Sequence, residues 1–252
     1  MNRVWRGIEL LTGWSAQQPV HIGGEVPMRT IRRSLLAFIV ALIPLNLTVG
    51  FLKWRDYELD EQPLAFFVWF DVGFERNVPT WVSTLLLASG ALAAVIASCK
   101  SVEPVLRRGY GFVAALMAWA SFDEANEIHE RASDPIRDAL DLGGALYWSW
   151  VLVALVAVPI IVLLLRRFLL DLPEPTRTHT ILSGVVFVGC AVGLEMFHAL
   201  LLDEGGQGNV VTELLGMVEE FGEMLAAMLF VDATLRYAST QALEQAVEPV
   251  GS

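Results

Sequence analysis

The most constraining feature of this sequence is a series of long apolar runs that recurs along its whole length. The chain has 252 residues, of which 55% are hydrophobic. A soluble domain usually carries fewer, because part of its surface must face water. Each run is long enough to cross a hydrocarbon core of roughly 30 Å, which needs about 20 helical residues. The runs do not alternate polar and apolar residues as barrel strands do. The sequence therefore predicts an all-α, polytopic transmembrane helical bundle.

We expect about six spans in one membrane domain covering residues 34–237. In chain order, the predicted spans are Ser34–Leu52, Trp81–Ser98, Tyr110–Arg131, Leu146–Leu165, Thr180–Leu202 and Val210–Tyr237. Residues 1–33 would form a cytoplasmic N-terminal segment, either a helix on the membrane surface or a tail without regular structure. Residues 238–252 would form a cytoplasmic tail.

The distribution of basic residues predicts the orientation of the bundle. With the N-terminus in the cytoplasm, twelve Lys and Arg residues fall on the cytoplasmic side and five on the other side. This split follows the positive-inside rule. We therefore expect both termini in the cytoplasm. The net charge of -11 argues against nucleic acid as a partner.

The third predicted span ends in the segment SFDEANEIHER, which carries acids and a histidine. Because a helix rises 1.5 Å per residue, Asp123 lies about 20 Å along this span, in the outer half of the bilayer. Asp123, Glu127 and Glu130 are spaced i, i+4, i+7, so we expect them to share one helical face. Glu124 and His129 would point to other sides of the helix.

The fifth and sixth spans bring further acids to the same depth. Glu195 and His198 form an E-x-x-H pair in the fifth span, where Gly189 and Gly193 predict a close approach by a neighbouring helix. In the sixth span, which runs inward, we expect Glu219 to turn away from a polar stripe. The residues of this stripe are Glu213, Gly216, Glu220 and Glu223.

These acids need positive charge from outside the spans. A carboxylate inside a bilayer costs several kcal/mol unless it is paired, protonated or bound to a cation. Arg131 is the only nearby basic residue within the spans, and it lies at the membrane edge. The balancing charge must come from protons, from a bound metal, or from water in an open cavity.

A bound metal is the most specific of these three alternatives. In helical bundles, di-iron and di-manganese sites combine Glu from some helices with Glu-x-x-His from others. The predicted metal ligands are Glu127, Glu130, Glu195, His198, Glu220 and Glu223. The predicted catalytic groups, as supports of the ligands or as a general acid/base pair, are Asp123, Glu124 and His129. This donor set favours iron or manganese, with calcium and zinc as alternatives.

Simpler interpretations stay open for several of these residues. Glu127 could form an ordinary i, i+4 ion pair with Arg131 at a helix end. His198 could be a hydrogen-bonded histidine at the membrane interface. Asp232 and Arg236 are expected to form a surface pair at the cytoplasmic end.

Three segments together resemble a known pattern: ERNVPTWVS at Glu75–Ser83, SFDEANEIHER at Ser121–Arg131 and VEEFGEM at Val218–Met224. They are similar to a group of uncharacterised bacterial multi-pass membrane proteins with N-x-P-T-W-x-S, S-x-D-E-x-x-x-I-H-E and E-E-x-x-E elements. The resemblance implies the bacterial inner (plasma) membrane and no particular reaction. It also implies a role for the residues at the matching positions, which are Asp123, Glu124, His129, Glu130, Glu195, Glu220 and Glu223. His198 lies outside the pattern.

The first of these elements allows two interpretations. Asn77, Pro79, Thr80 and Trp81 either cover the site as a lid or only fix the start of the second span.

Three functions are consistent with this sequence. The first is an integral membrane metalloprotein, whose metal could serve a hydrolase or oxidoreductase acting on a lipid or quinone-like substrate. The second is an ion- or proton-handling transporter, because intramembrane acids and histidines are typical of such pathways. The third is an accessory subunit of a larger membrane complex. The expected partners are membrane lipids, with a larger complex or a homo-oligomer as alternatives.

Overall fold

The computed structural model describes residues 28–55, 65–203 and 210–247, and within these ranges it contains helices and no strands. The described elements are α2 (Met28–Trp54), α3 (Ala65–Val68), α4 (Val78–Lys100), α5 (Pro104–Asn126), α6 (Ile128–Leu140), η1 (Gly144–Leu146), α7 (Trp150–Asp171), α8 (Glu174–Val188), η2 (Gly189–Leu194), α9 (Glu195–Asp203) and α10 (Val210–Val247). The predicted all-α class is therefore confirmed for these ranges. The predicted surface helix of the N-terminus and the last residues of the tail lie outside them.

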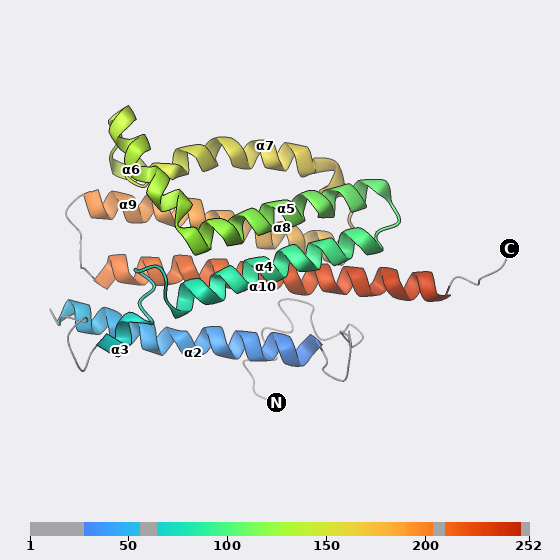
Figure 1. The fold of residues 1–252 in the computed structure, drawn as a ribbon, viewed down its shortest axis with the longest axis horizontal. Coiled ribbons are helices and arrows are strands. Elements are labelled where there is room, and N and C mark those ends of the chain that lie inside the picture. Colours follow the sequence, from blue (N-terminus) through green and yellow to red (C-terminus); the bar gives the residue numbers. More distant parts are fainter. Residues whose placement is uncertain (1–27, 56–64, 204–209, 248–252) are drawn as a thin grey trace.

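The long helices run roughly along one axis, and α10 is the one around which the others gather (Figure 1). Helix α10 packs against α2, α4, α8, η2 and α9, whereas α5 packs against α4 and α7. With 38 residues, α10 is about 57 Å long at 1.5 Å per residue. It continues beyond Tyr237, where the sequence predicted its end.

Two buried apolar clusters hold the bundle together. In one of them, the Tyr110 ring of α5 lies between Phe168 of α7 and Tyr237 of α10, at centroid distances of 4.9 and 5.0 Å. Gly109 permits this packing, because a Cβ atom at that position would collide with the Phe168 ring. In the other cluster, Met224 of α10 is fully buried among side chains of α2 and α4.

Four helical segments of the described chain are long and apolar enough to cross a membrane: Arg32–Lys53, Val78–Lys100, Trp150–Asp171 and Glu174–Leu201. The last of these segments joins α8, η2 and α9. Helices α5 and α10, which the sequence also predicted to span, are not among the four. The count of about six spans and the orientation of the termini therefore stay predictions.

The outside of the bundle is strongly apolar. Large hydrophobic side chains are exposed on most of the long helices, and on α7 Leu163 is 71% and Leu164 66% exposed. Contiguous apolar surface of this kind is rare on soluble monomers. It suits contact with lipid and agrees with the membrane class that the sequence predicted.

The third predicted span is not one continuous helix. Helix α5 ends at Asn126, and Glu127 adopts a left-handed conformation with φ of 55° before α6 begins at Ile128. A left-handed residue interrupts the helical repeat. The prediction that Asp123, Glu127 and Glu130 share one face of a single helix is therefore wrong.

The fifth predicted span also departs from a regular α-helix. Residues Gly189–Leu194 form a π-helical segment, η2, immediately before Glu195. Nothing lies within 4 Å of a Cβ atom built on Gly189 or Gly193, so the predicted close approach at these glycines is wrong. The close contact occurs instead between Cys190 and Gly222 of α10, where a Cβ atom would meet the Cys190 sulfur.

The pair of Asp232 and Arg236 is present, but not on the surface. Asp232 is only 2% exposed, and its carboxylate lies 2.8 Å from Arg236 Nε and 3.6 Å from Arg32 Nη1. The expectation of a surface pair is wrong, because α2 packs against α10 and covers Asp232.

Candidate functional site

The break between α5 and α6 places His129 against Asp123. The backbone N–H of His129 donates a hydrogen bond to Asp123 Oδ1 at 3.0 Å, and His129 Nδ1 lies 2.7 Å from Asp123 Oδ2. One carboxylate thus accepts a backbone hydrogen bond from the first turn of α6 and orients the imidazole ring. Glu130 and Glu195 lie close enough for their charges to act on His129.

Glu127 pairs with two arginines, Arg76 and Arg131. Arg76 Nη2 donates to Glu127 Oε2 at 3.0 Å, and Arg131 Nη2 lies 3.3 Å from the same oxygen. Arg76 also adopts a left-handed conformation, with φ of 62°. The ion pair with Arg131, which the sequence had left open, is therefore present, and a second arginine adds to it.

The N-x-P-T-W element fixes the start of α4. Asn77 is the N-cap residue and accepts a hydrogen bond from Thr80 N at 3.2 Å, while Pro79 occupies the first turn. The Thr80 hydroxyl donates to Glu75 Oε2 at 3.0 Å. Trp81 is 61% exposed on the outside of the bundle. The element therefore both starts the helix and holds the Glu75 carboxyl.

Glu75 belongs to the same electrostatic environment as the predicted site. Burial raises the pKa of its carboxyl above the ordinary value, and the charge of Glu130 raises that pKa further. Glu75 lies in the segment before α4, outside the candidate spans. This segment thus contributes an acid to the site.

Trp150 connects two of the predicted site residues. Its indole Nε1 donates to Glu195 Oε1 at 3.0 Å. Its ring packs edge-on against the His129 ring, at a centroid distance of 5.1 Å. Glu195 of α9 and His129 of α6 are therefore held on either side of one residue at the start of α7.

The second residue of the E-x-x-H pair is also close to an acid. His198 Nδ1 lies 3.8 Å from Glu219 Oε2, and both side chains are mostly buried. Glu219, which helical spacing placed away from the stripe of acids on α10, is therefore in contact with a predicted ligand. The charge of Glu219 also acts on Glu195, Glu220 and Glu223.

The acids of α10 divide into two groups. Glu220 and Glu223 experience the charges of Glu124 of α5 and Glu195 of α9. Glu213 does not share this environment, because its Oε1 lies 3.2 Å from Lys53 Nζ.

We use the name acidic centre for the group that these contacts bring together. Its members are Glu75, Asp123, Glu124, His129, Glu130, Glu195, His198, Glu219, Glu220 and Glu223. Among the described residues, none of its carboxylates forms an ion pair with a lysine or arginine, whereas both histidines contact a carboxylate. The carboxyl groups of the centre therefore outnumber the cationic side chains that could balance them.

In the part of the chain that the structure describes, no group of three or more His, Cys, Asp and Glu side chains is arranged so that it could hold a metal ion. The structure does bring most of the predicted ligands into one neighbourhood. Glu127, another predicted ligand, forms ion pairs with Arg76 and Arg131 instead. The role of each residue as a ligand stays a prediction.

Three members of this neighbourhood could not be identified from the sequence. Glu75 precedes α4 in a loop, and only its place beside the N-x-P-T-W element links it to the site. Helical spacing placed Glu219 away from the other acids of α10. Its contact with His198 depends on how α9 follows η2, which the spacing along α10 does not reveal. Trp150 gives no signal in a sequence with eight tryptophans.

A family model described as a domain of unknown function (DUF8692) matches residues 35–238. The matched range includes every member of the acidic centre. No curated protein and no solved structure matches the chain.

Proposed function

We propose a function for this chain, which belongs to the family of the domain of unknown function DUF8692: its acidic centre binds a divalent metal ion. The observation that supports this proposal is the charge of the centre. Of its eight carboxyl groups, Asp123 and Glu219 contact a histidine, and within the described residues none of the eight forms an ion pair with lysine or arginine. Buried carboxylates at this density need protons or a bound cation.

The arrangement of His129 favours a metal as that cation. Metal-binding histidines almost always use their second ring nitrogen to bond a carboxylate, which fixes the tautomer and the ring orientation. Asp123 makes such a contact with Nδ1 of His129, which leaves Nε2 for another partner. Glu195, whose charge acts on His129, would be a further ligand.

The remaining ligands would come from α10. Glu220 and Glu223 experience the charge of Glu195, and Glu219 contacts His198. Carboxylates with one or two imidazoles suit iron or manganese better than softer metals. A metal there could serve an enzyme acting on a lipid or quinone-like substrate.

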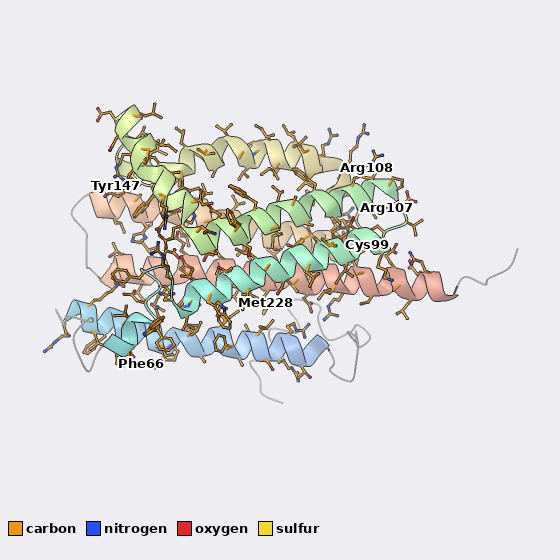
Figure 2. All side chains as sticks on the ribbon, viewed as in Figure 1. Phe66, Cys99, Arg107, Arg108, Tyr147 and Met228 are labelled. Atoms are coloured by element: carbon orange, nitrogen blue, oxygen red, sulfur yellow. The ribbon has the colours of Figure 1, made fainter. Side chains whose placement is uncertain are left out.

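The proposal includes a bundle of six crossings, with both termini in the cytoplasm and the acidic centre near the outer side. Helices α5 and α10 lie alongside the four apolar spans and along roughly the same axis (Figure 1). In Figure 2, Phe66 and Tyr147 lie at one end of the bundle and Arg107 and Arg108 at the other. The arginine end fits the cytoplasmic side.

Metal analysis of the purified protein tests the proposal. Protein produced with iron and manganese in the medium should retain about one equivalent of metal or more. The variant Glu220→Gln, which removes one charge from the centre and keeps the shape of the side chain, should lose at least 10-fold in metal affinity, as expected when a ligand is replaced.

The matched control is Glu244→Gln, on the same helix. Glu244 is exposed and lies 24 residues, or about 36 Å, further along α10. This variant should retain as much metal as the wild type. Wild-type protein without stoichiometric iron, manganese, zinc or calcium would contradict the proposal.

The contact between Asp123 and His129 supports a second candidate function, which is proton transfer. A carboxylate 2.7 Å from an imidazole nitrogen can pass a proton through one hydrogen bond. In liposomes with a pH-sensitive dye, such a protein would move protons without added metal, and Asp123→Asn would stop this movement. Proton flux in metal-free wild type would therefore rank this function above metal binding.

A further inference from the structure

We propose that an anionic phospholipid binds where the start of α5 meets the end of α7, with its phosphate between Arg108 and Arg167. This surface lies at the end of the bundle that Arg107 and Arg108 mark, opposite the end where Tyr147 lies (Figure 2). No member of the acidic centre belongs to it.

A close contact between α5 and α7 brings the two arginines to one place. Gly109 of α5 packs so tightly on the Phe168 ring of α7 that a Cβ atom at Gly109 would collide with it. The two helices are antiparallel, because α5 begins and α7 ends at the same end of the bundle (Figure 1). Arg108 and Arg167 each precede one residue of this contact.

Helix geometry places both arginines on the same side of the contact. Successive residues turn by about 100° around a helix axis. Because α5 and α7 run in opposite directions, the residue that precedes each contact residue turns to the same side of the pair. Arg108 and Arg167 therefore flank the contact between Gly109 and Phe168 together.

The side of the pair that carries the arginines faces the outside of the bundle. Tyr110, on the opposite side, is fully buried, whereas Arg108 and Arg167 are exposed. Phe112 follows Arg108 by four residues and Leu164 precedes Arg167 by three, so each shares a helical face with its arginine. Phe112 is 38% and Leu164 66% exposed. Both lie about one helical turn nearer the middle of the bundle than the arginines.

The charge of this surface suits a phosphate. Arg108, Arg166 and Arg167 are exposed, and none of them forms an ion pair with a carboxylate of the described residues. Asp171, one turn beyond Arg167 toward the end of α7, is exposed and is not paired with it within the same residues. Guanidinium groups bind phosphate oxygens through two parallel hydrogen bonds, so Arg108 and Arg167 can hold one phosphate from two helices.

The apolar side chains beside the arginines favour a lipid over a soluble anion. Leu163 and Leu164 are among the most exposed large hydrophobic side chains of the described chain, and they lie directly below Arg167 along α7. A phospholipid whose phosphate contacts the arginines would lay its acyl chains on this apolar surface. Basic residues next to a membrane-spanning helix attract anionic headgroups in this way.

Lipid binding to the full-length protein tests this site. Native mass spectrometry in a mild detergent, with added dioleoyl phosphatidylglycerol, measures the affinity for an anionic phospholipid. We expect Arg108→Gln and Arg167→Gln each to weaken binding about 5-fold, the usual effect of one arginine near an anionic lipid surface. The variant with both changes should bind more weakly than either alone. Because both side chains are exposed, unfolding without added lipid should match the wild type.

Arg55→Gln is the matched control. Arg55 is exposed just after the end of α2, which lies at the opposite end of the bundle (Figure 1). It should bind phosphatidylglycerol like the wild type. The proposal is overturned if the double variant binds as tightly as Arg55→Gln, or if phosphatidylcholine binds as tightly as phosphatidylglycerol. Displacement of the lipid by millimolar inorganic phosphate would also overturn it, because the site would then be one for soluble anions.

Discussion

At the scale of single residues, the surroundings of Glu75 disfavour the ionised form of its carboxyl group. Burial and the nearby charge of Glu130 raise the pKa of its carboxyl in the folded protein. The folded state therefore binds this proton more tightly than the unfolded chain does. Stability is greatest below the ordinary value of 4.5 and decreases as the pH rises through the raised pKa.

We predict that Glu75→Gln stabilises the protein at neutral pH. Glutamine keeps an acceptor for the Thr80 hydroxyl and carries no charge. The free energy of unfolding in detergent should exceed that of the wild type above about pH 5, and the difference should disappear well below the ordinary carboxyl pKa. Glu174→Gln, which changes an exposed acid at the start of α8, should show no such pH dependence. A Glu75→Gln variant less stable than the wild type at pH 7 would contradict this prediction.

Residue types and spacing were sufficient to propose most of the acidic centre. Counting helical residues from the ends of the predicted spans placed Asp123, Glu220 and Glu223 at a similar depth, although α10 has 38 residues and α5 only 23. Side-chain partners such as Arg76 for Glu127 depend on contacts 51 residues apart, which no local pattern contains. The sequence therefore predicted where the acids gather better than it predicted which of them are already paired.

At the scale of elements, the contact between η2 and α10 depends on a glycine. A Cβ atom at Gly222 would collide with the Cys190 sulfur, so the two helices can approach only because Gly222 has no side chain. We predict that Gly222→Ala lowers the free energy of unfolding by about 1–3 kcal/mol, the usual range for overpacking a buried contact.

A double-mutant cycle separates this contact from general effects of alanine. Cys190→Ala removes the sulfur, so Cys190→Ala with Gly222→Ala should recover most of the lost stability. Gly189→Ala is the control, because nothing lies within 4 Å of its added Cβ atom. Additive losses in the double variant would show that the sulfur is not the cause.

The two irregular elements were not predictable from hydropathy. The run through Tyr110–Arg131 reads as one helix, because Glu127 is a residue that helices accept. Its left-handed conformation coincides with a tertiary contact from Arg76 to Glu127 and with the local hydrogen bond from His129 N–H to Asp123. The π-helical turn before Glu195 likewise accompanies the packing of Cys190 on Gly222. Both lie next to the acidic centre, as π-helical turns at functional sites often do.

At the scale of the whole molecule, the exposed cysteine allows the orientation of the bundle in the membrane to be tested. Cys99 is exposed and lies at the same end of the bundle as Arg107 and Arg108, whereas Cys190 is buried (Figure 2). We predict that a membrane-impermeant maleimide labels Cys99 in inside-out vesicles and not in intact spheroplasts. Cys99→Ser should abolish the labelling, and the opposite sidedness would contradict the predicted topology.

The double use of Asp123 has a consequence for how any loss of function here should be interpreted. The same carboxylate secures the first turn of α6 and sets the tautomer of His129. Folding and proton chemistry consequently share one group, and replacing it with alanine would impair both at once. Asparagine can keep the hydrogen bond to the His129 backbone while removing the charge. Comparing the alanine and asparagine variants therefore separates a loss of the first turn of α6 from a loss of proton transfer at His129.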